Sequence, residues 1–173
     1  MTGIIIRNQT DADLAAVLTL VTAAYRGLPH ASGTEPFIMD ALWTSGGAVV
    51  ALVAEDGTGL VGQGAFSVAH IFGKGTGWHV LGPLAVRPDR QRRGVGSALI
   101  RAGFDRLRAK GSAGCIVAGD PAYYQRFGFR RVPDLHVPGI PDPYVMALPF
   151  DDTLPSGAVD FHEAFAATEP VSN

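Results

Sequence analysis

The sequence predicts a mixed α/β fold of the α+β kind, and two observations carry this prediction. Three apolar runs at residues 48–54, 59–71 and 79–86 are separated by short turns that contain glycine, which is typical of an antiparallel meander. A segment with helical spacing at residues 92–110 then lies between two strand-like runs, which indicates a parallel crossover. With 47% hydrophobic and 17% charged residues among 173, the chain has the composition of a globular domain.

One strand and two helices are expected before the meander. The β-branched run Ile4–Ile6 is good strand material near the N-terminus. Thr10-x-x-Asp13 resembles a capping box with Asp in place of Glu, and apolar residues at helical spacing follow it. We therefore expect an amphipathic helix over residues 11–26 and a second, short helix over residues 35–43.

Two glycines interrupt the second run of the meander. Gly62 and Gly64 predict either a β-bulge or a stretch of backbone left bare for a ligand. Four further elements are expected after helix 92–110: a buried strand at 113–118, a short helix at 121–126, and strands at 129–132 and 144–148. Residues 1–150 are expected to form one domain, and residues 151–173 an extension that packs on it.

Charge, cysteine and histidine patterns exclude several classes of protein. The formal net charge of −2 argues against a generally basic nucleic-acid binder. The single cysteine, Cys115, cannot form an internal disulfide and lies in an apolar run, so we expect a buried, inert thiol. No leader opens the chain, no run approaches about 18 apolar residues, and no histidine spacing suits a metal, so a cytoplasmic protein without metal or membrane partner is expected.

The segment between strand 79–86 and helix 92–110 is the main candidate for a ligand site. It reads Gln91-Arg92-Arg93-Gly94-Val95-Gly96, and the unpaired N–H groups of a helix start attract phosphate. Gly94 and Gly96 let a phosphate approach without a Cβ in the way, although a tight turn accounts for them equally well. A Rossmann fingerprint is excluded because Leu99 stands where glycine is required, and Gly73-Lys74-Gly75 is no Walker A loop.

Two ordered motifs resemble those of the GNAT (GCN5-related N-acetyltransferase) family. Gln91-x-x-Gly94-x-Gly96, preceded by Leu84-Ala85-Val86-x-Pro88, is similar to the acetyl-CoA-binding motif of that family. Tyr124-Gln125-Arg126-Phe127-Gly128-Phe129 resembles its downstream signature. The similarity covers about residues 3–132 and is greatest to a bacterial subgroup of predicted N-acetyltransferases. It implies the GNAT fold, a mixed central sheet of about six to seven strands flanked by about four helices.

The resemblance also implies acetyl-CoA as co-substrate and assigns the site residues. Leu84 and Val86 offer backbone groups to the pantetheine arm, and an N–H near Ala85 steadies the oxyanion. Gln91, Arg92, Arg93, Gly94, Val95, Gly96 and Ser97 hold the pyrophosphate, and Asp120, Tyr123 and Phe127 lie beside the cofactor. Tyr124 is the general acid that protonates the leaving thiolate. Arg87 and Arg90 are expected to be solvated or to face phosphate together with Arg92 and Arg93.

The expected activity is transfer of the acetyl group of acetyl-CoA to a primary amine of a small molecule, by direct attack in a ternary complex. The alternatives are a non-catalytic acyl-CoA-binding or sensor domain, and an acetyltransferase whose acceptor is a protein or an aminoacyl-tRNA. The general base is open: many relatives have a Glu before the pyrophosphate loop, but Val80-Leu81-Gly82-Pro83 lacks a carboxylate. His70 and His79, acting through water, are the candidates. Tyr144–Phe150 is a candidate homodimer edge.

Overall fold

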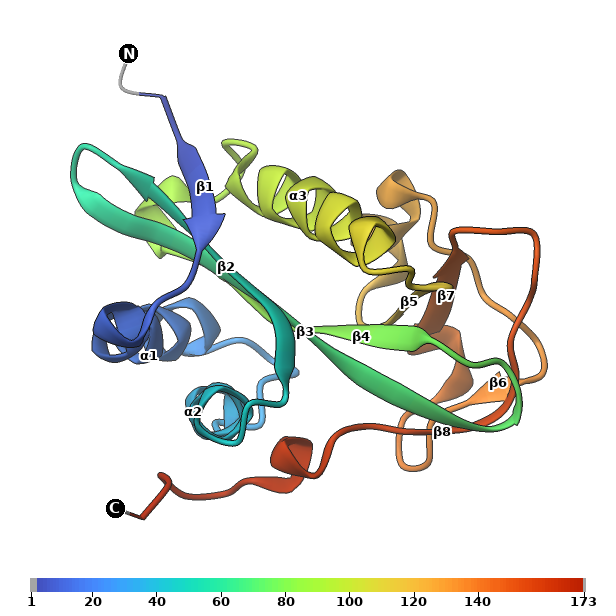
Figure 1. Cartoon of the computed structure of the whole chain (residues 1–173). Coiled ribbons are helices and arrows are strands. Elements are labelled where there is room, and N and C mark those ends of the chain that lie inside the picture. Colours follow the sequence, from blue (N-terminus) through green and yellow to red (C-terminus); the bar gives the residue numbers. More distant parts are fainter. Residues whose placement is uncertain (1–2, 173) are drawn as a thin grey trace.

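In the computed structural model, which describes residues 3–172, eight strands form one mixed sheet with four α-helices packed around it (Figure 1). The strands are β1 (Ile5–Asn8), β2 (Ala48–Asp56), β3 (Gly59–Lys74), β4 (Trp78–Val86), β5 (Gly114–Ala118), β6 (Leu135–His136), β7 (Val145–Pro149) and β8 (Ser156–Asp160). The helices are α1 (Leu14–Tyr25), α2 (Glu35–Thr44), α3 (Val95–Ala109) and α4 (Pro121–Tyr124). The predicted α/β class is confirmed.

The order of the main sheet is β1-β2-β3-β4-β5-β7. Strands β1 to β4 pair antiparallel, and β5 pairs parallel to β4 after the crossover through α3, as predicted. The strand expected at residues 129–132 is wrong, because only Arg130 bridges to Ala147 and Pro133, which has no N–H, follows soon after. Strands β6 and β8 were not predicted; β8 pairs with the second half of β3.

The helices cover both faces of the sheet. Figure 1 shows α1 and α2 on one face and α3 on the other. Val17, Val21 and Met39 form the buried layer under α1 and α2. Leu99 and Phe104 of α3 belong to the second, larger core. The capping box of Thr10 and Asp13 is present and leads through one short 3-10 turn into α1.

Gly62 serves the packing of α3 on the sheet. A Cβ on Gly62 would lie 2.7 Å from Val95 Cγ1 and 2.9 Å from Leu99 Cδ1, so only glycine lets the helix approach so closely. Gly64 adjoins the register shift between β3 and β4, which is the bulge that the sequence predicted. The structure thus assigns these two glycines to helix packing and to the bulge.

Residues after 150 run back along the sheet and past α2. Strand β8 lies between β3 and β6, and the 3-10 turn Glu163–Ala166 packs on α2. The Val171 N–H donates to Asp40 Oδ2 of α2 at 3.1 Å. No helix in the described part of the chain combines the length and apolarity that a membrane crossing requires. Within residues 3–172 there is no cluster of three or more side chains of the metal-ligating types.

Candidate active site

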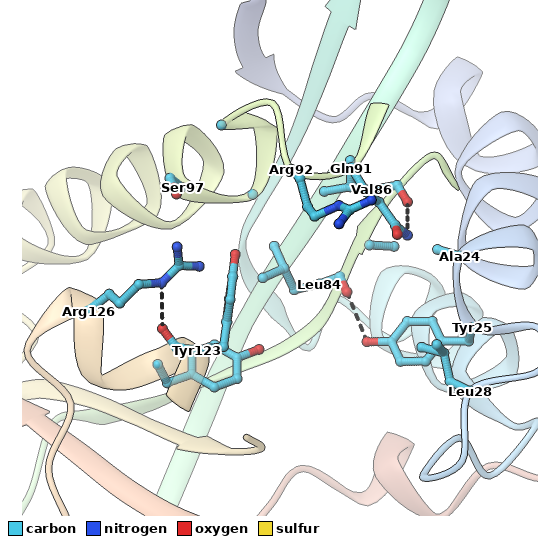
Figure 2. Close-up of a pocket in the computed structure, with 14 residues that line it drawn as sticks. Ala24, Tyr25, Leu28, Leu84, Val86, Gln91, Arg92, Ser97, Tyr123 and Arg126 are labelled. Carbon is cyan, nitrogen blue, oxygen red and sulfur yellow. Dashed lines mark hydrogen bonds between the residues drawn. The ribbon is translucent and has the colours of Figure 1, made fainter. Parts of the chain in front are cut away.

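A cavity of about 710 Å³ lies where β4, the end of α1, the start of α3 and α4 meet (Figure 2). It is open to solvent, and segments more than 100 residues apart in the sequence contribute to it. Its lining residues are Ala24, Tyr25, Leu28, Leu84, Ala85, Val86, Gln91, Arg92, Gly94, Gly96, Ser97, Tyr123, Tyr124 and Arg126. Ten of the fourteen site residues expected from the sequence are in this set.

The exposed edge of β4 forms one wall. Strand β4 pairs with β5 only over Trp78–Val80, so β4 extends beyond the end of that pairing. The Leu84 carbonyl accepts a hydrogen bond from the Tyr25 hydroxyl at 2.9 Å, and the Val86 carbonyl accepts one from Gln91 Nε2 at 3.2 Å. Backbone groups of Leu84 and Val86 therefore face the cavity, as a strand-edge contact with an extended ligand requires.

The N-terminus of α3 forms the opposite end of the cavity. Gly94 is the residue before the helix and has φ 84°, a left-handed conformation that favours glycine. Because of this turn α3 begins at Val95, not at Arg92 as expected. The first N–H groups of a 15-residue helix have no intrahelical partner and carry positive dipole character, which attracts anions.

The arginines before α3 divide into two groups. Arg87 binds Asp89 at 2.6 Å and Arg90 binds Asp56 at 3.0 Å, so both are held in ion pairs. This corrects the expectation that all four arginines face solvent or phosphate, since the turn folds back onto two carboxylates. Arg92 lines the cavity; Arg93 is exposed and does not. Of these four arginines, only Arg92 therefore lines the cavity.

Tyr124 closes the cavity at the end of α4. Its ring lies on Gly119, where a Cβ would come within 2.5 Å of Tyr124 Cε2. The ring also packs edge-on against Tyr123 and Phe129, with centroid distances of 4.9 and 5.8 Å. Burial is the largest cause that raises the pKa of Tyr124 above its ordinary value. The phenol therefore stays protonated at neutral pH, which suits a proton donor.

Tyr123 approaches the start of α3. A Cβ on Gly96 would lie 2.7 Å from the Tyr123 hydroxyl oxygen. The phenol therefore occupies the space that a side chain at position 96 would need. Arg126 stacks on the Tyr123 ring at 4.6 Å and donates through Nε to the Tyr123 carbonyl at 3.2 Å (Figure 2). The glycine motif of α3 and the aromatic motif of α4 thus meet in space.

Four expected site residues lie outside the cavity lining: Arg93, Val95, Asp120 and Phe127. The Val95 side chain is buried in the core, and Phe127 packs on Tyr123 at 5.4 Å. Asp120 accepts the Ala122 N–H at 3.0 Å, which caps α4, and it lines a neighbouring cavity of about 670 Å³. Any contact of Val95 with a bound anion is therefore limited to its backbone.

Four lining residues were not anticipated: Ala24, Tyr25, Leu28 and Arg126. Tyr25 lies at an apolar position of the amphipathic helix predicted over residues 11–26. Its hydroxyl instead reaches β4, and burial raises its pKa to about 12. A tyrosine at the last turn of a helix was the only signal, and it does not distinguish packing from a site.

The two histidines considered as bases do not line this cavity. His79 Nδ1 lies 2.7 Å from Ser112 Oγ, and burial lowers its pKa. His70 is exposed on the half of β3 that pairs with β8. Neither position supports direct or short-range proton transfer in the cavity.

Comparison with known proteins agrees with this geometry. Residues 47–131 match the family model described as an acetyltransferase (GNAT) domain. The chain is 30% identical over 168 residues to the uncharacterized N-acetyltransferase YhbS of Escherichia coli, which covers 93% of this chain and 98% of that protein. The crystal structure of YhbS in complex with CoA has a TM-score of 0.87 at 28% identity, covering 98% of this chain and 96% of that one.

A second solved structure is also similar over nearly the whole chain. The GNAT family acetyltransferase from Brucella melitensis in complex with acetyl-CoA has a TM-score of 0.84 and 36% identity, and the match covers 95% of this chain and 99% of that one. The ribosomal-protein-S18-alanine N-acetyltransferase of Escherichia coli, with a TM-score of 0.61 and 19% identity over 87% of this chain and 96% of that one, shares the fold.

Proposed function

The chain belongs to the acetyltransferase (GNAT) family, and we propose that it transfers the acetyl group of acetyl-CoA to a primary amine of a small molecule. The amine attacks the thioester directly, in a ternary complex. The observation that supports this proposal is the meeting, in one cavity, of an exposed strand edge, a helix N-terminus and a protonated phenol. The relatives from Escherichia coli and Brucella were solved with CoA and acetyl-CoA, respectively.

The cavity residues fit acetyl-CoA in a defined order. The N–H groups at the start of α3, with Arg92 beside them, suit the pyrophosphate. The backbone groups of Leu84 and Val86 suit the amides of the pantetheine arm, which runs along β4 like an added strand. Apart from Gly94 itself and its chain neighbours, no residue has an atom within 4 Å of the position of a Cβ on Gly94, so the turn leaves room for a phosphate.

Tyr124 is proposed as the general acid. When the amine attacks, charge develops on the carbonyl oxygen and then on the departing sulfur. The Tyr124 phenol donates its proton to the thiolate, and a backbone N–H near Ala85 stabilises the oxyanion. A general acid of this kind accelerates a reaction by roughly 10²–10⁴-fold.

The acceptor is proposed to be small. A tRNA acceptor requires a wide basic face, and the net charge of −2 does not favour one. A protein acceptor is a second candidate, since an enzyme of the same fold is the ribosomal-protein-S18-alanine N-acetyltransferase of Escherichia coli. A cytoplasmic location and a homodimer built on β7, the last strand of the main sheet, also stay proposals.

The decisive experiment measures release of the CoA thiol from acetyl-CoA with a panel of primary amines and a chromogenic disulfide reagent. Cys115 is buried, so the thiol of the protein contributes little background. Amine-dependent thiol release is expected, together with an acetylated product seen by mass spectrometry. Tight acetyl-CoA binding without turnover on any amine or peptide would instead identify an acyl-CoA-binding domain.

A further inference from the structure

A second cavity, of about 350 Å³, adjoins the acetyl-CoA cavity at the end of α1. The two share Tyr25 and Leu28 as lining residues, and the segment between α1 and α2 forms most of the second one. Its remaining lining residues are Thr22, Arg26, Gly27, Ala31, Ser32, Gly33, Glu35 and Pro36. Small residues predominate in this set, so the cavity, hereafter the α1–α2 cavity, offers space beside the β4 edge.

Glu35, the first residue of α2, lines the α1–α2 cavity and is only 9% exposed. Its Oε1 accepts the Ser32 N–H at 2.7 Å, which ties the connecting segment to the helix start. Its Oε2 is buried and has no hydrogen-bond partner among the residues that the structure describes. The structural role therefore accounts for one carboxylate oxygen and leaves the other unpaired.

A buried carboxylate oxygen without a partner is unfavourable, which makes a cationic ligand the natural complement of Glu35 Oε2. Arg26 lines the same cavity, but no ion pair joins it to Glu35 in residues 3–172. Burial raises the pKa of Tyr25 to about 12, and the charge of Glu35 contributes to that rise, so the carboxylate acts on the residue that contacts β4. The α1–α2 cavity and the acetyl-CoA cavity share Tyr25, whose hydroxyl contacts Leu84, so an ammonium bound in the α1–α2 cavity is next to the β4 wall.

We propose that the α1–α2 cavity receives the acceptor amine and that Glu35 binds its ammonium and removes the proton. Glu35 then serves as the general base, a role for which β4 has no carboxylate at Val80–Pro83. The ammonium gives one proton to Glu35, which later releases it to solvent. The nitrogen lone pair forms the N–C bond and the C–S bond breaks. The thiolate takes the Tyr124 proton, and the second nitrogen proton restores the phenol.

This inference rests on the proposed acetyltransferase function, and the substitution Glu35→Gln tests it separately. Glutamine keeps an oxygen that can accept the Ser32 N–H, so α2 and the connecting segment should fold as before. The probes are benzylamine, phenethylamine and putrescine, with thiol release measured at pH 7. For each amine that the wild type acetylates, kcat/KM is expected to fall at least 100-fold in Glu35→Gln. The Kd for acetyl-CoA, measured by calorimetry, should change less than twofold.

A pH series separates deprotonation from a structural effect. The activity of Glu35→Gln should rise about tenfold per pH unit from pH 7 to 9, because free neutral amine, with a pKa of about 10, becomes more abundant. The other titratable groups of the cavity are Arg26 and Tyr25, and the Tyr25 pKa of about 12 leaves it protonated throughout that range. The wild type should depend on pH less steeply.

Asp40→Asn is the matched control, since it removes the same charge from the same helix outside the cavity and can still accept the Val171 N–H. It should retain wild-type kcat/KM. Unchanged kcat/KM in Glu35→Gln, or an equal loss at pH 7 and 9, would overturn the role of Glu35 while leaving the acetyltransferase intact. Acetyl-CoA binding by the wild type without turnover on any amine would overturn the proposed function and this inference with it.

Discussion

The Tyr25 hydroxyl donates a 2.9 Å hydrogen bond to the Leu84 carbonyl and so joins α1 to β4 across 59 positions of sequence. The bond fixes the wall that the two cavities share. It also presents the β4 edge next to the start of α3, where an acyl-CoA is proposed to lie (Figure 2).

Removal of the Tyr25 hydroxyl should weaken this wall. In Tyr25→Phe the ring packing stays and the hydrogen bond is lost, so the free energy of unfolding should fall by about 1 kcal/mol. Denaturant unfolding followed by circular dichroism measures this change. Tyr144→Phe, at an exposed tyrosine, is the control and should leave stability unchanged. Equal stability of both variants would show that the Tyr25–Leu84 bond contributes nothing.

Removal of the Tyr124 hydroxyl should affect chemistry and not binding. Tyr124→Phe keeps the ring on Gly119 but cannot protonate the thiolate, so kcat should fall by about 10²–10⁴-fold. The Kd for acetyl-CoA should stay within twofold by calorimetry. Tyr123→Phe, at the neighbouring ring, should lose less than tenfold in kcat. A Tyr124→Phe enzyme with wild-type kcat would remove Tyr124 from the mechanism.

Alanine at Gly96 should disturb the anion site through Tyr123. The added Cβ would lie 2.7 Å from the Tyr123 hydroxyl oxygen, so the ring must shift away from the start of α3. We expect the Kd for acetyl-CoA to rise about tenfold, equivalent to about 1.4 kcal/mol. The double variant Gly96→Ala with Tyr123→Phe has no hydroxyl to displace and should recover part of the affinity. No recovery would mean that the methyl group itself excludes the ligand.

The protein should lose stability above pH 10 because of its buried tyrosines. Burial raises the pKa of Tyr25 to about 12, and that of Tyr124 also lies above its ordinary value. The unfolded chain therefore releases these protons first, near pH 10, and the free energy of unfolding falls as pH rises toward the folded-state values. Below about pH 10 both groups are protonated in the folded and the unfolded state, so they do not make the free energy of unfolding depend on pH. Urea unfolding at pH 8, 10 and 11 checks this, and the combined Tyr25→Phe and Tyr124→Phe variant should show a shallower decline.

Several parts of the site could be predicted because they depend on local chain geometry. The strand that ends at Val86 and the helix start with Gly94 and Gly96 are encoded in short segments, since apolar runs and glycine spacing act over a few residues. The role of Tyr124 as general acid, in contrast, was implied only by the resemblance of its motif to that of the GNAT family. The order of these motifs then indicated the GNAT family, to which the chain belongs.

Local pattern alone misjudged residues whose partners are distant. Phe129–Val132 is apolar enough for a strand, but only Arg130 forms a bridge, to Ala147. Whether such a segment becomes a strand depends on the neighbouring strand that it can pair with. Strand β8 was missed because Ser156–Asp160 pairs with the far half of β3, a contact that no short window contains. Gly62 was predicted to mark either a bulge or backbone left bare for a ligand, and the packing of α3 explains it instead.

The spacing of neighbouring residues was enough to predict the fold class, and the order of two motifs that resemble those of the GNAT family indicated the family. Two further residues, Tyr25 and Glu35, line the cavities because of tertiary contacts. Spacing along α1 identifies Tyr25 only as an apolar position, and its hydrogen bond to Leu84 needs the folded chain. The unpaired oxygen of Glu35 likewise results from burial in the folded chain. The physical reason is that hydrogen-bond partners and desolvation are properties of the packed chain, and they act between segments that sequence proximity does not connect.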